Sequence, residues 1–169
     1  IPNSDIANAL TPVAPTTQLG VIAFGDSGGP TSLKNLINSS AVVQADVTGV
    51  GTERFKLAAS NYGGDKAVFA FGQNGTDVVN TKNLVNSSGV IASDASGTGT
   101  ARGACAAAGY GTDKAVFGFG YNGSSVINLI SNTGVQASDS GGTGTSRSRL
   151  GCATYDNDKA IFVFGVNSS

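Results

Sequence analysis

One passage of nine residues occurs three times in this chain, and each copy begins with Asp and ends with Arg. The copies lie at 46–54, 94–102 and 139–147, and each contains Gly-x-Gly-Thr. Seventeen residues after each Arg, a Phe-Gly pair ends a short apolar segment, and a further pair begins at Phe24. Because a tandem repeat builds one small structural unit several times, the chain must fold into a series of similar units.

The spacing of the Phe-Gly pairs defines the units. Phe24, Phe71, Phe119 and Phe164 are separated by 47, 48 and 45 residues. All of the length variation lies between each Phe and the next Asp of the repeat, where we expect a loop. The prediction is a single repeat domain over 1–169, with units at approximately 7–53, 54–101, 102–146 and, in part, 147–169.

Each unit contains the signals of four short strands. In the second unit we expect strands at 54–63, 66–72 and 81–85. A fourth is expected at 89–94, before the Gly-x-Gly-Thr turn, whose glycines would supply positive φ. Asn74-Gly75 is typical of a hairpin between two strands. The 25 Gly residues and the low charged fraction of 12% favour short strands over helices.

Four strands in a unit of this size are characteristic of a β-propeller blade. The order of Arg, apolar strand, Tyr-Gly and a strand ending at Gly resembles the kelch repeat. It departs from that repeat in having F-x-F-G in place of a double Gly and in lacking a later Trp. We therefore expect an all-β fold of about three and a half kelch-like propeller blades, with the ring completed by a second chain or by further repeats. A β-trefoil, which needs only three four-stranded units, is the alternative.

Residues that recur in every unit are expected to build the fold. They include six Asp, three Arg and three Lys, which make up 12 of the 21 charged residues. We expect Asp–Arg pairs and Asp side chains that cap turns. The recurring Tyr62, Tyr110 and Tyr155 are expected to fill the space between blades. Cys105 and Cys152 are expected to be small buried side chains, and a disulfide between them is left open.

Two motifs imitate functional signatures. Residues 25–30 spell Gly-Asp-Ser-Gly-Gly-Pro, as at the nucleophile of chymotrypsin-like proteases, but the chain has no His to accept the Ser proton. The Gly-x-Gly of the repeat leads into a strand rather than a helix, which is unlike a nucleotide site. A net charge of −1 predicts no nucleic-acid surface, and no apolar run approaches the roughly 20 residues of a membrane span. We expect no enzyme activity, catalytic residue, metal or cofactor.

Residues that break the register of the repeat are the candidates for ligand binding. Tyr121 is the one Tyr outside the recurring positions, and it lies in a loop of variable length. An exposed Tyr beside amides and hydroxyls can stack on a sugar and hydrogen-bond it. The predicted binding residues are Tyr121, Asn122, Ser124, Gln73, Asn74, Thr76 and Asp77.

The units also resemble a known group of repeats. Segments of the form L-V-x-x-S-G-V-x-A-S-D-x-x-G-T-G-T-A-R, followed by A-A-A-G-Y-G-T-D-K-A-V-F-G-F-G, look like repeats in virion structural proteins of marine and cyanobacterial phages, over residues 42–165. The resemblance implies a non-enzymatic tail-fibre or capsid-surface protein on the virion, with a role in assembly and host attachment. Its implied partners are further copies of itself, other virion proteins and cell-surface glycans. A cellular, lectin-like carbohydrate-binding module is the alternative.

Overall fold

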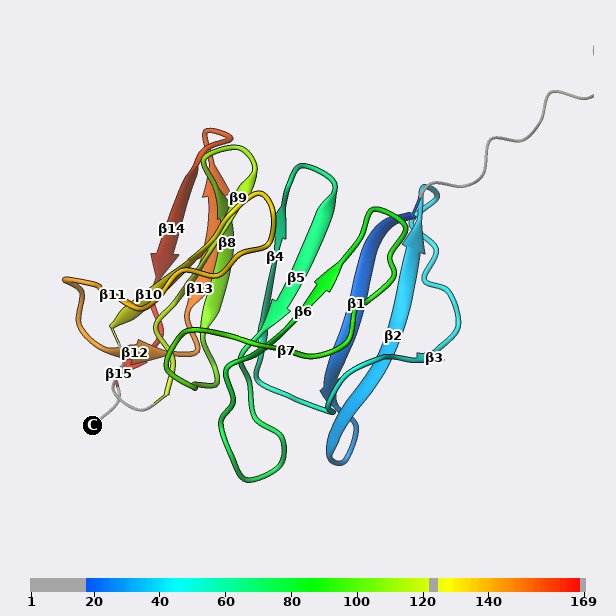
Figure 1. The fold of residues 1–169 in the computed structure, drawn as a ribbon, viewed down its shortest axis with the longest axis horizontal. Coiled ribbons are helices and arrows are strands. Elements are labelled where there is room, and N and C mark those ends of the chain that lie inside the picture. Colours follow the sequence, from blue (N-terminus) through cyan, green and yellow to red (C-terminus); the bar gives the residue numbers. More distant parts are fainter. Residues whose placement is uncertain (1–17, 122–124, 168–169) are drawn as a thin grey trace, which may run out of the picture.

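The computed structural model describes residues 18–121 and 125–167, which form an all-β structure of small antiparallel sheets (Figure 1). Sheet 1 contains β1 (Gln18–Asp26), β2 (Pro30–Asn38) and β3 (Val47–Thr48). Sheet 2 contains β4 (Ala58–Tyr62), β5 (Lys66–Ala70), β6 (Thr81–Val85) and β7 (Ala95–Ser96). Sheet 3 contains β8 (Ala106–Tyr110), β9 (Lys114–Gly118), β10 (Val126–Ile130) and β11 (Ser140–Gly141). Sheet 4 contains β13 (Gly151–Tyr155) and β14 (Lys159–Val163), and β12 (Arg147–Ser148) pairs with β15 (Val166–Asn167).

In sheets 1 to 4 the strands follow the order of the chain, so one continuous segment builds each of them, whereas the paired strands β12 and β15 lie on either side of sheet 4 in the chain. In sheet 2, Val68 of β5 lies opposite Ser60 of β4 and Leu84 of β6. In sheet 3, Val116 of β9 has the same two opposite positions, in β8 and β10. The all-β prediction is confirmed, and the strand register recurs with the sequence repeat.

The sheets stack one beside the next along the array (Figure 1), and alternating side chains fill the spaces between them. On one face of sheet 2, Val68 and Phe71 pack in a cluster with Phe117 of sheet 3. On the other face, Phe69 packs against Phe24 of sheet 1, with ring centroids 5.5 Å apart. Removing each large apolar side chain from water contributes about 1.5–3 kcal/mol, so the spaces between sheets form the core.

The fourth strand lies further along the chain than the sequence predicts. It was expected at 89–94, but in sheet 2 the pairing strand is β7, which starts after Asp94. The preceding segment forms a turn in which the Oδ1 of Asn86 accepts hydrogen bonds from the amides of Ser88 and Val90. Such side-chain bonds to the backbone compete with the hydrogen bonds between strands, which explains why the fourth strand begins later in the sequence.

The glycines of Gly-x-Gly-Thr serve close packing more than positive φ. Gly51 has a φ of 113°, but Gly97 and Gly99 are not in the left-handed region. A Cβ on Gly97 would lie 2.3 Å from the backbone carbonyl oxygen of Asn80, and one on Gly99 would lie 2.6 Å from the side-chain nitrogen Nδ2 of Asn128. The prediction of positive φ is right for Gly51 and wrong for Gly49, Gly97, Gly99, Gly142 and Gly144. At Gly97 and Gly99 the lack of a side chain permits contact with a neighbouring segment.

The two cysteines differ in environment. Cys105 is buried, which raises the pKa of its thiol to about 11, and Cys152 is exposed. Both are free, and the thiol of Cys152 donates a hydrogen bond to the carbonyl of Ala107, at 2.7 Å. The predicted burial is right for Cys105 and wrong for Cys152, which faces β8 of sheet 3 but lies in β13, a strand that is exposed along its whole length.

The described sheets do not close into a ring. Sheet 1 and sheet 4 lie at opposite ends of the array in Figure 1. The number of propeller blades therefore stays a prediction, as does the trefoil alternative. Within the two described ranges there is no helix long and apolar enough to cross a membrane.

Candidate functional site

Each recurring Arg lies over the Phe of the preceding Phe-Gly pair. The Arg Cζ is 4.6 Å from the ring centroid for Arg54 and Phe24, 3.8 Å for Arg102 and Phe71, and 5.1 Å for Arg147 and Phe119. Arg54 and Arg102 are completely buried. A guanidinium over an aromatic face is attracted by the ring quadrupole, so the three Arg residues join one unit to the next.

The backbone reinforces these Arg–Phe joints. The carbonyl of the Arg accepts a hydrogen bond from the Gly that follows the Phe, at 2.8 Å from Gly25, 2.9 Å from Gly72 and 2.9 Å from Gly120. The Phe itself has a φ of 63° at Phe24, 65° at Phe71 and 60° at Phe119. Left-handed backbone at a bulky residue is strained and persists only where its surroundings hold it, and at these three positions the Arg of the next unit is part of those surroundings.

The recurring Asp residues bind the turn of the preceding unit. Asp94 accepts hydrogen bonds from the amide and the hydroxyl of Thr52, at 2.9 and 2.6 Å, and from Asn83, at 2.8 Å. Its Oδ1 lies 3.6 Å from Nη1 of Arg54. Burial alone would raise the pKa of Asp94, but these hydrogen bonds and the Arg54 charge outweigh burial, and the pKa is lowered. The predicted Asp–Arg pair is present, and it connects two successive copies of the repeat.

Stability should depend on pH through these carboxylates. Asp139 repeats the arrangement with Thr100 and Asn128, and its pKa is likewise lowered by those hydrogen bonds despite burial. A lowered folded-state pKa gives stability that is present above the unfolded Asp pKa of about 3.9 and is lost as the pH falls toward the folded value. We expect the free energy of unfolding in urea to fall below about pH 4.

The variant that tests this dependence is the double change Asp94→Asn and Asp139→Asn. We expect it to be less stable than the parent at neutral pH and to approach the parent as the pH falls from about 4 toward the lowered folded-state pKa of the two carboxylates, because the parent groups then become protonated. Parallel pH profiles for the two proteins would contradict this explanation.

The segment that imitates a protease signature forms the turn between β1 and β2. The Oδ1 of Asp26 accepts hydrogen bonds from the amides of Gly28 and Gly29, at 3.1 and 2.9 Å. Asp side chains commonly close turns in this way. The geometry therefore agrees with a structural reason for this sequence.

The predicted binding residues fall into three groups. Asn122 and Ser124 lie outside the described residues. Asn74, Thr76 and Asp77 are exposed in the loop between β5 and β6. Gln73 and Tyr121 lie closer to the sheets, and the structure brings these two into contact with one shared side chain, Lys56.

Tyr121 lies between two cations. The Nζ of Lys56 is 5.4 Å from the Tyr121 ring centroid, and the Cζ of Arg149 is 5.7 Å from it. Two nitrogens of Arg149 donate to the Tyr121 hydroxyl, at 3.1 and 2.9 Å. Lys56 also donates to the Oε1 of Gln73, at 3.2 Å. We call these four residues, Lys56, Gln73, Tyr121 and Arg149, the Tyr121 cluster.

The repeat explains how the cluster forms. Lys56, Ala104 and Arg149 each follow a recurring Arg by two residues, and their φ angles are 53°, 52° and 55°. The amide of Ala104 donates to the carbonyl of Lys56, and that of Arg149 to the carbonyl of Ala104, at 2.7 and 2.9 Å. The three positions therefore stack on successive units, and the short side chain of Ala104 leaves Tyr121 flanked by two long cationic ones. The sequence alone did not indicate Lys56 and Arg149, although their change of type at one repeat position was visible.

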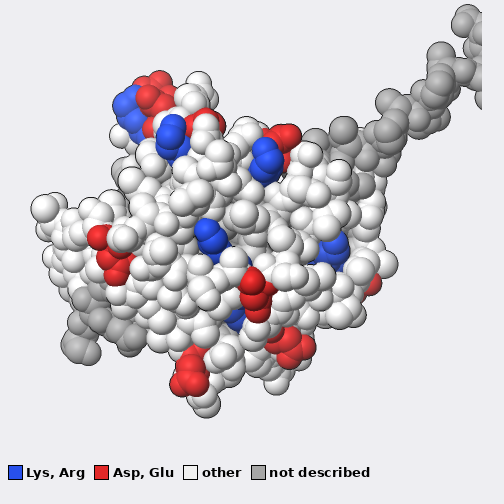
Figure 2. Space-filling model, in the orientation of Figure 1, with Lys and Arg blue, Asp and Glu red and all other residues white. Residues whose placement is uncertain are grey.

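The cluster has the chemistry of an anion site. Among the ion pairs within the described residues, none involves Lys56 or Arg149. Figure 2 shows that charged side chains are few and scattered on the face it presents. Arg and Lys side chains bind carboxylate, sulfate and phosphate groups, and a neighbouring Tyr can contact a sugar ring. An acidic sugar is the ligand class that fits both features.

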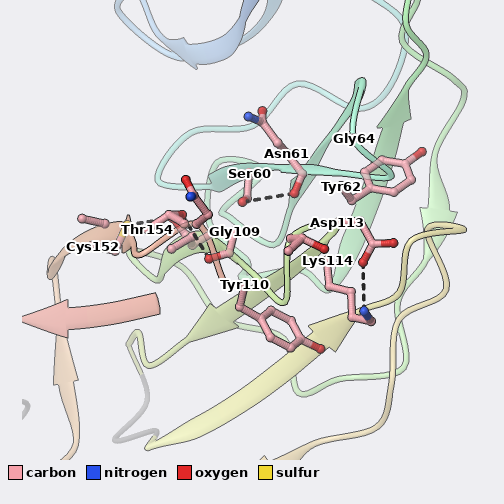
Figure 3. Close-up of a pocket in the computed structure, with 15 residues that line it drawn as sticks. Ser60, Asn61, Tyr62, Gly64, Gly109, Tyr110, Asp113, Lys114, Cys152 and Thr154 are labelled. Carbon is pink, nitrogen blue, oxygen red and sulfur yellow. Dashed lines mark hydrogen bonds and ion pairs between the residues drawn. The ribbon is translucent and has the colours of Figure 1, made fainter. Parts of the chain in front are cut away.

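A cavity of about 420 Å³ lies between β4, β8 and β13 (Figure 3). Its polar groups bind one another: Asp113 pairs with Lys114 at 2.8 Å, and the hydroxyl of Thr154 donates to the carbonyl of Gly109 at 3.0 Å. Figure 3 shows these two contacts on opposite sides of the lining. A cavity of about 690 Å³ lies beside Asp65 and Lys66, the equivalent pair of the preceding unit. A gap that recurs with the repeat is best explained by the spacing of the sheets.

Within the described part of the chain, no three His, Cys, Asp or Glu side chains are grouped so as to hold a metal ion. The sequence matches no protein-family model, and no curated protein matches it.

Proposed function

We propose that this chain is a non-enzymatic structural protein of a bacteriophage virion, a tail-fibre or capsid-surface module that serves assembly and host attachment. The observation that supports it most is the Arg–Phe joint, which uses the recurring charged and aromatic residues to connect unit to unit. Residues used in this way hold an array together and are not free to act on a substrate. The resemblance of residues 42–165 to phage repeats supplies the virion location.

In this proposal the sheets are successive kelch-like propeller blades, about three and a half in number. β4 lies against β8 and β9, and β8 lies against β13 and β14, so sheets 2, 3 and 4 approach one another along their first two strands. Sheets that meet along their first strands radiate from a common axis, as propeller blades do. Further copies of the chain, other virion proteins and host glycans are the proposed partners, and no cofactor is required.

Immunogold electron microscopy tests the proposal. Antibodies raised against the purified chain are applied to concentrated phage particles from marine and cyanobacterial lysates, with pre-immune serum as the control. We expect gold at the tails or on the capsid surface. Gold confined to host cells and membrane vesicles would overturn the virion assignment and support a cellular protein.

A lectin-like carbohydrate-binding module is the second candidate, and the Tyr121 cluster favours it. We expect the chain to bind oligosaccharides that carry a carboxylate or sulfate in preference to neutral ones on a glycan array. Tyr121→Ala and the double variant Lys56→Gln, Arg149→Gln should each weaken this binding about tenfold or more, because about 1.4 kcal/mol corresponds to a factor of 10. Charge-assisted hydrogen bonds to an anion are of this size or larger.

The matched control for that experiment is Lys66→Gln. Lys66 is also an exposed cation, but it pairs with Asp65 at 3.1 Å and lies outside the cluster. We expect it to bind as the parent does. A folded parent chain that binds no acidic glycan, or an equal loss in the Lys66 variant, would contradict a site at Tyr121.

A further inference from the structure

The last sheet leaves open an apolar face that is covered in the earlier sheets. Phe164 is 82% exposed, whereas its counterparts Phe24, Phe71 and Phe119 are 8%, 0% and 8% exposed. Ile161 on the same face is 45% exposed, and its counterpart Val68 in sheet 2 is fully buried. The exposed face therefore has the composition of a surface that is core elsewhere in the same chain.

The backbone of this face already has the conformation of the covered ones. Phe164 and Gly165 have φ angles of 59° and 97°, close to the 65° and 104° of Phe71 and Gly72. At Phe71 the next unit places Arg102 over the ring and accepts a hydrogen bond from the Gly72 amide. The Phe164-Gly165 pair thus presents the two groups that one unit contributes to a joint, namely a ring face and a backbone amide, in the same geometry.

We propose that this face binds a further repeat unit that carries the Asp-to-Arg passage, with the Arg of that unit over Phe164 and its carbonyl accepting from the Gly165 amide. The argument is continuity with an interface that occurs three times along the chain. The first unit of a second copy is not the expected occupant, because seventeen residues before Phe24 the sequence has Ala7 where the other units have Arg. The inference goes beyond the proposed virion role and holds for any protein built from these repeats.

Extension of the chain tests the proposal directly. Residues 121–167 are copied and joined after Gly165, so that the copy brings its own Asp-to-Arg passage to the open face. We expect Phe164→Ala to lower the melting temperature by about 1 °C or less in the parent, where the ring is exposed, and by about 6–12 °C in the extended chain, where it becomes core. Replacing the Arg of the appended passage with Ala should cause a smaller loss of about 2–4 °C, because its counterpart Arg147 is half-buried.

Hydrogen exchange of the Gly165 amide gives a readout that general stabilisation does not imitate. We expect this amide to exchange at least about tenfold more slowly in the extended chain, because it gains a carbonyl partner. Equal effects of Phe164→Ala in the two proteins, or unchanged exchange at Gly165, would overturn the proposal. Should the first extension fail to fold, a copy of residues 73–119, which carries the buried Arg102, provides the same test.

Two measurements on the parent chain at several concentrations decide whether a second copy fills the face: sedimentation velocity reports association, and hydrogen exchange reports protection of the Gly165 amide. We expect this amide to remain unprotected at every concentration, whatever other association takes place. A parent oligomer in which the Gly165 amide is protected would show that a second copy fills the face and would overturn the chosen occupant. None of these outcomes depends on the immunogold result, so a failure of the virion assignment remains distinguishable.

Discussion

Replacing Arg102 with Ala should lower the free energy of unfolding by about 3 kcal/mol or more. The side chain is completely buried, its guanidinium lies 3.8 Å from the ring centroid of Phe71, and Nη1 donates to the carbonyl of Thr100 at 3.1 Å. Its loss removes the attraction to the ring and leaves a cavity between sheets 2 and 3. Urea titration followed by circular dichroism measures the change.

The same substitution at Arg147 is the matched control. Arg147 occupies the equivalent position, but it is only half-buried, and its Cζ is 5.1 Å from the ring centroid of Phe119. We expect Arg147→Ala to cost about 1 kcal/mol, in the range of an exposed cation–π contact. Losses of equal size at the two positions would show that burial of Arg102 is not the reason for its effect.

The fold could be predicted from the sequence to the extent that it is local. Strands at 66–72 and 81–85 are predicted from alternating apolar residues and a turn at Asn74-Gly75, and the structure has β5 at Lys66–Ala70 and β6 at Thr81–Val85. β5 ends two residues early because Phe71 and Gly72 have positive φ. The position of β7 could not be predicted, because it depends on whether Asn86 binds backbone amides or leaves them to the ladder. The reason why position 97 requires Gly could not be predicted either, since the carbonyl that it approaches belongs to Asn80, 17 positions earlier.

The candidate site was predicted in part for a similar reason. Tyr121 and Gln73 stood out because they lie in loops that break the repeat. Lys56 and Arg149 belong to the repeat itself, and they reach Tyr121 only because successive units stack at these positions. In the same way, the Asp–Arg pairing was foreseen, but which copies pair is settled by stacking, which places Arg54 beside Asp94. Contacts between units thus supply what local sequence does not contain.

Replacing Gly72 with Ala is expected to be the second large loss. Gly72 has a φ of 104°, and a Cβ there would lie 2.9 Å from the carbonyl oxygen of Phe55 and 3.0 Å from the Cβ of Leu57. The backbone strain alone costs about 1–3 kcal/mol. The clash adds to it, because a backbone carbonyl cannot rotate aside as a flexible side chain can. We expect a total loss of about 3 kcal/mol or more in urea titration.

Gly75→Ala separates the two contributions, because Gly75 has a similar φ of 99° but no described atom within 4 Å of the added Cβ. Its loss should stay within the strain of about 1–3 kcal/mol. The difference between the two variants then measures how tightly the Phe-Gly pair is held against the segment that follows Arg54. If Gly75→Ala were as costly as Gly72→Ala, backbone strain alone would explain why a Gly recurs after each Phe of the Phe-Gly pairs. A larger loss at Gly72 would show that contact within its own unit fixes the Phe-Gly pair in the conformation that the joint with the next unit uses. Gly165 has the equivalent contact, since a Cβ there would lie 2.8 Å from the carbonyl oxygen of Ser148, so the open pair at Phe164 is held in the same way.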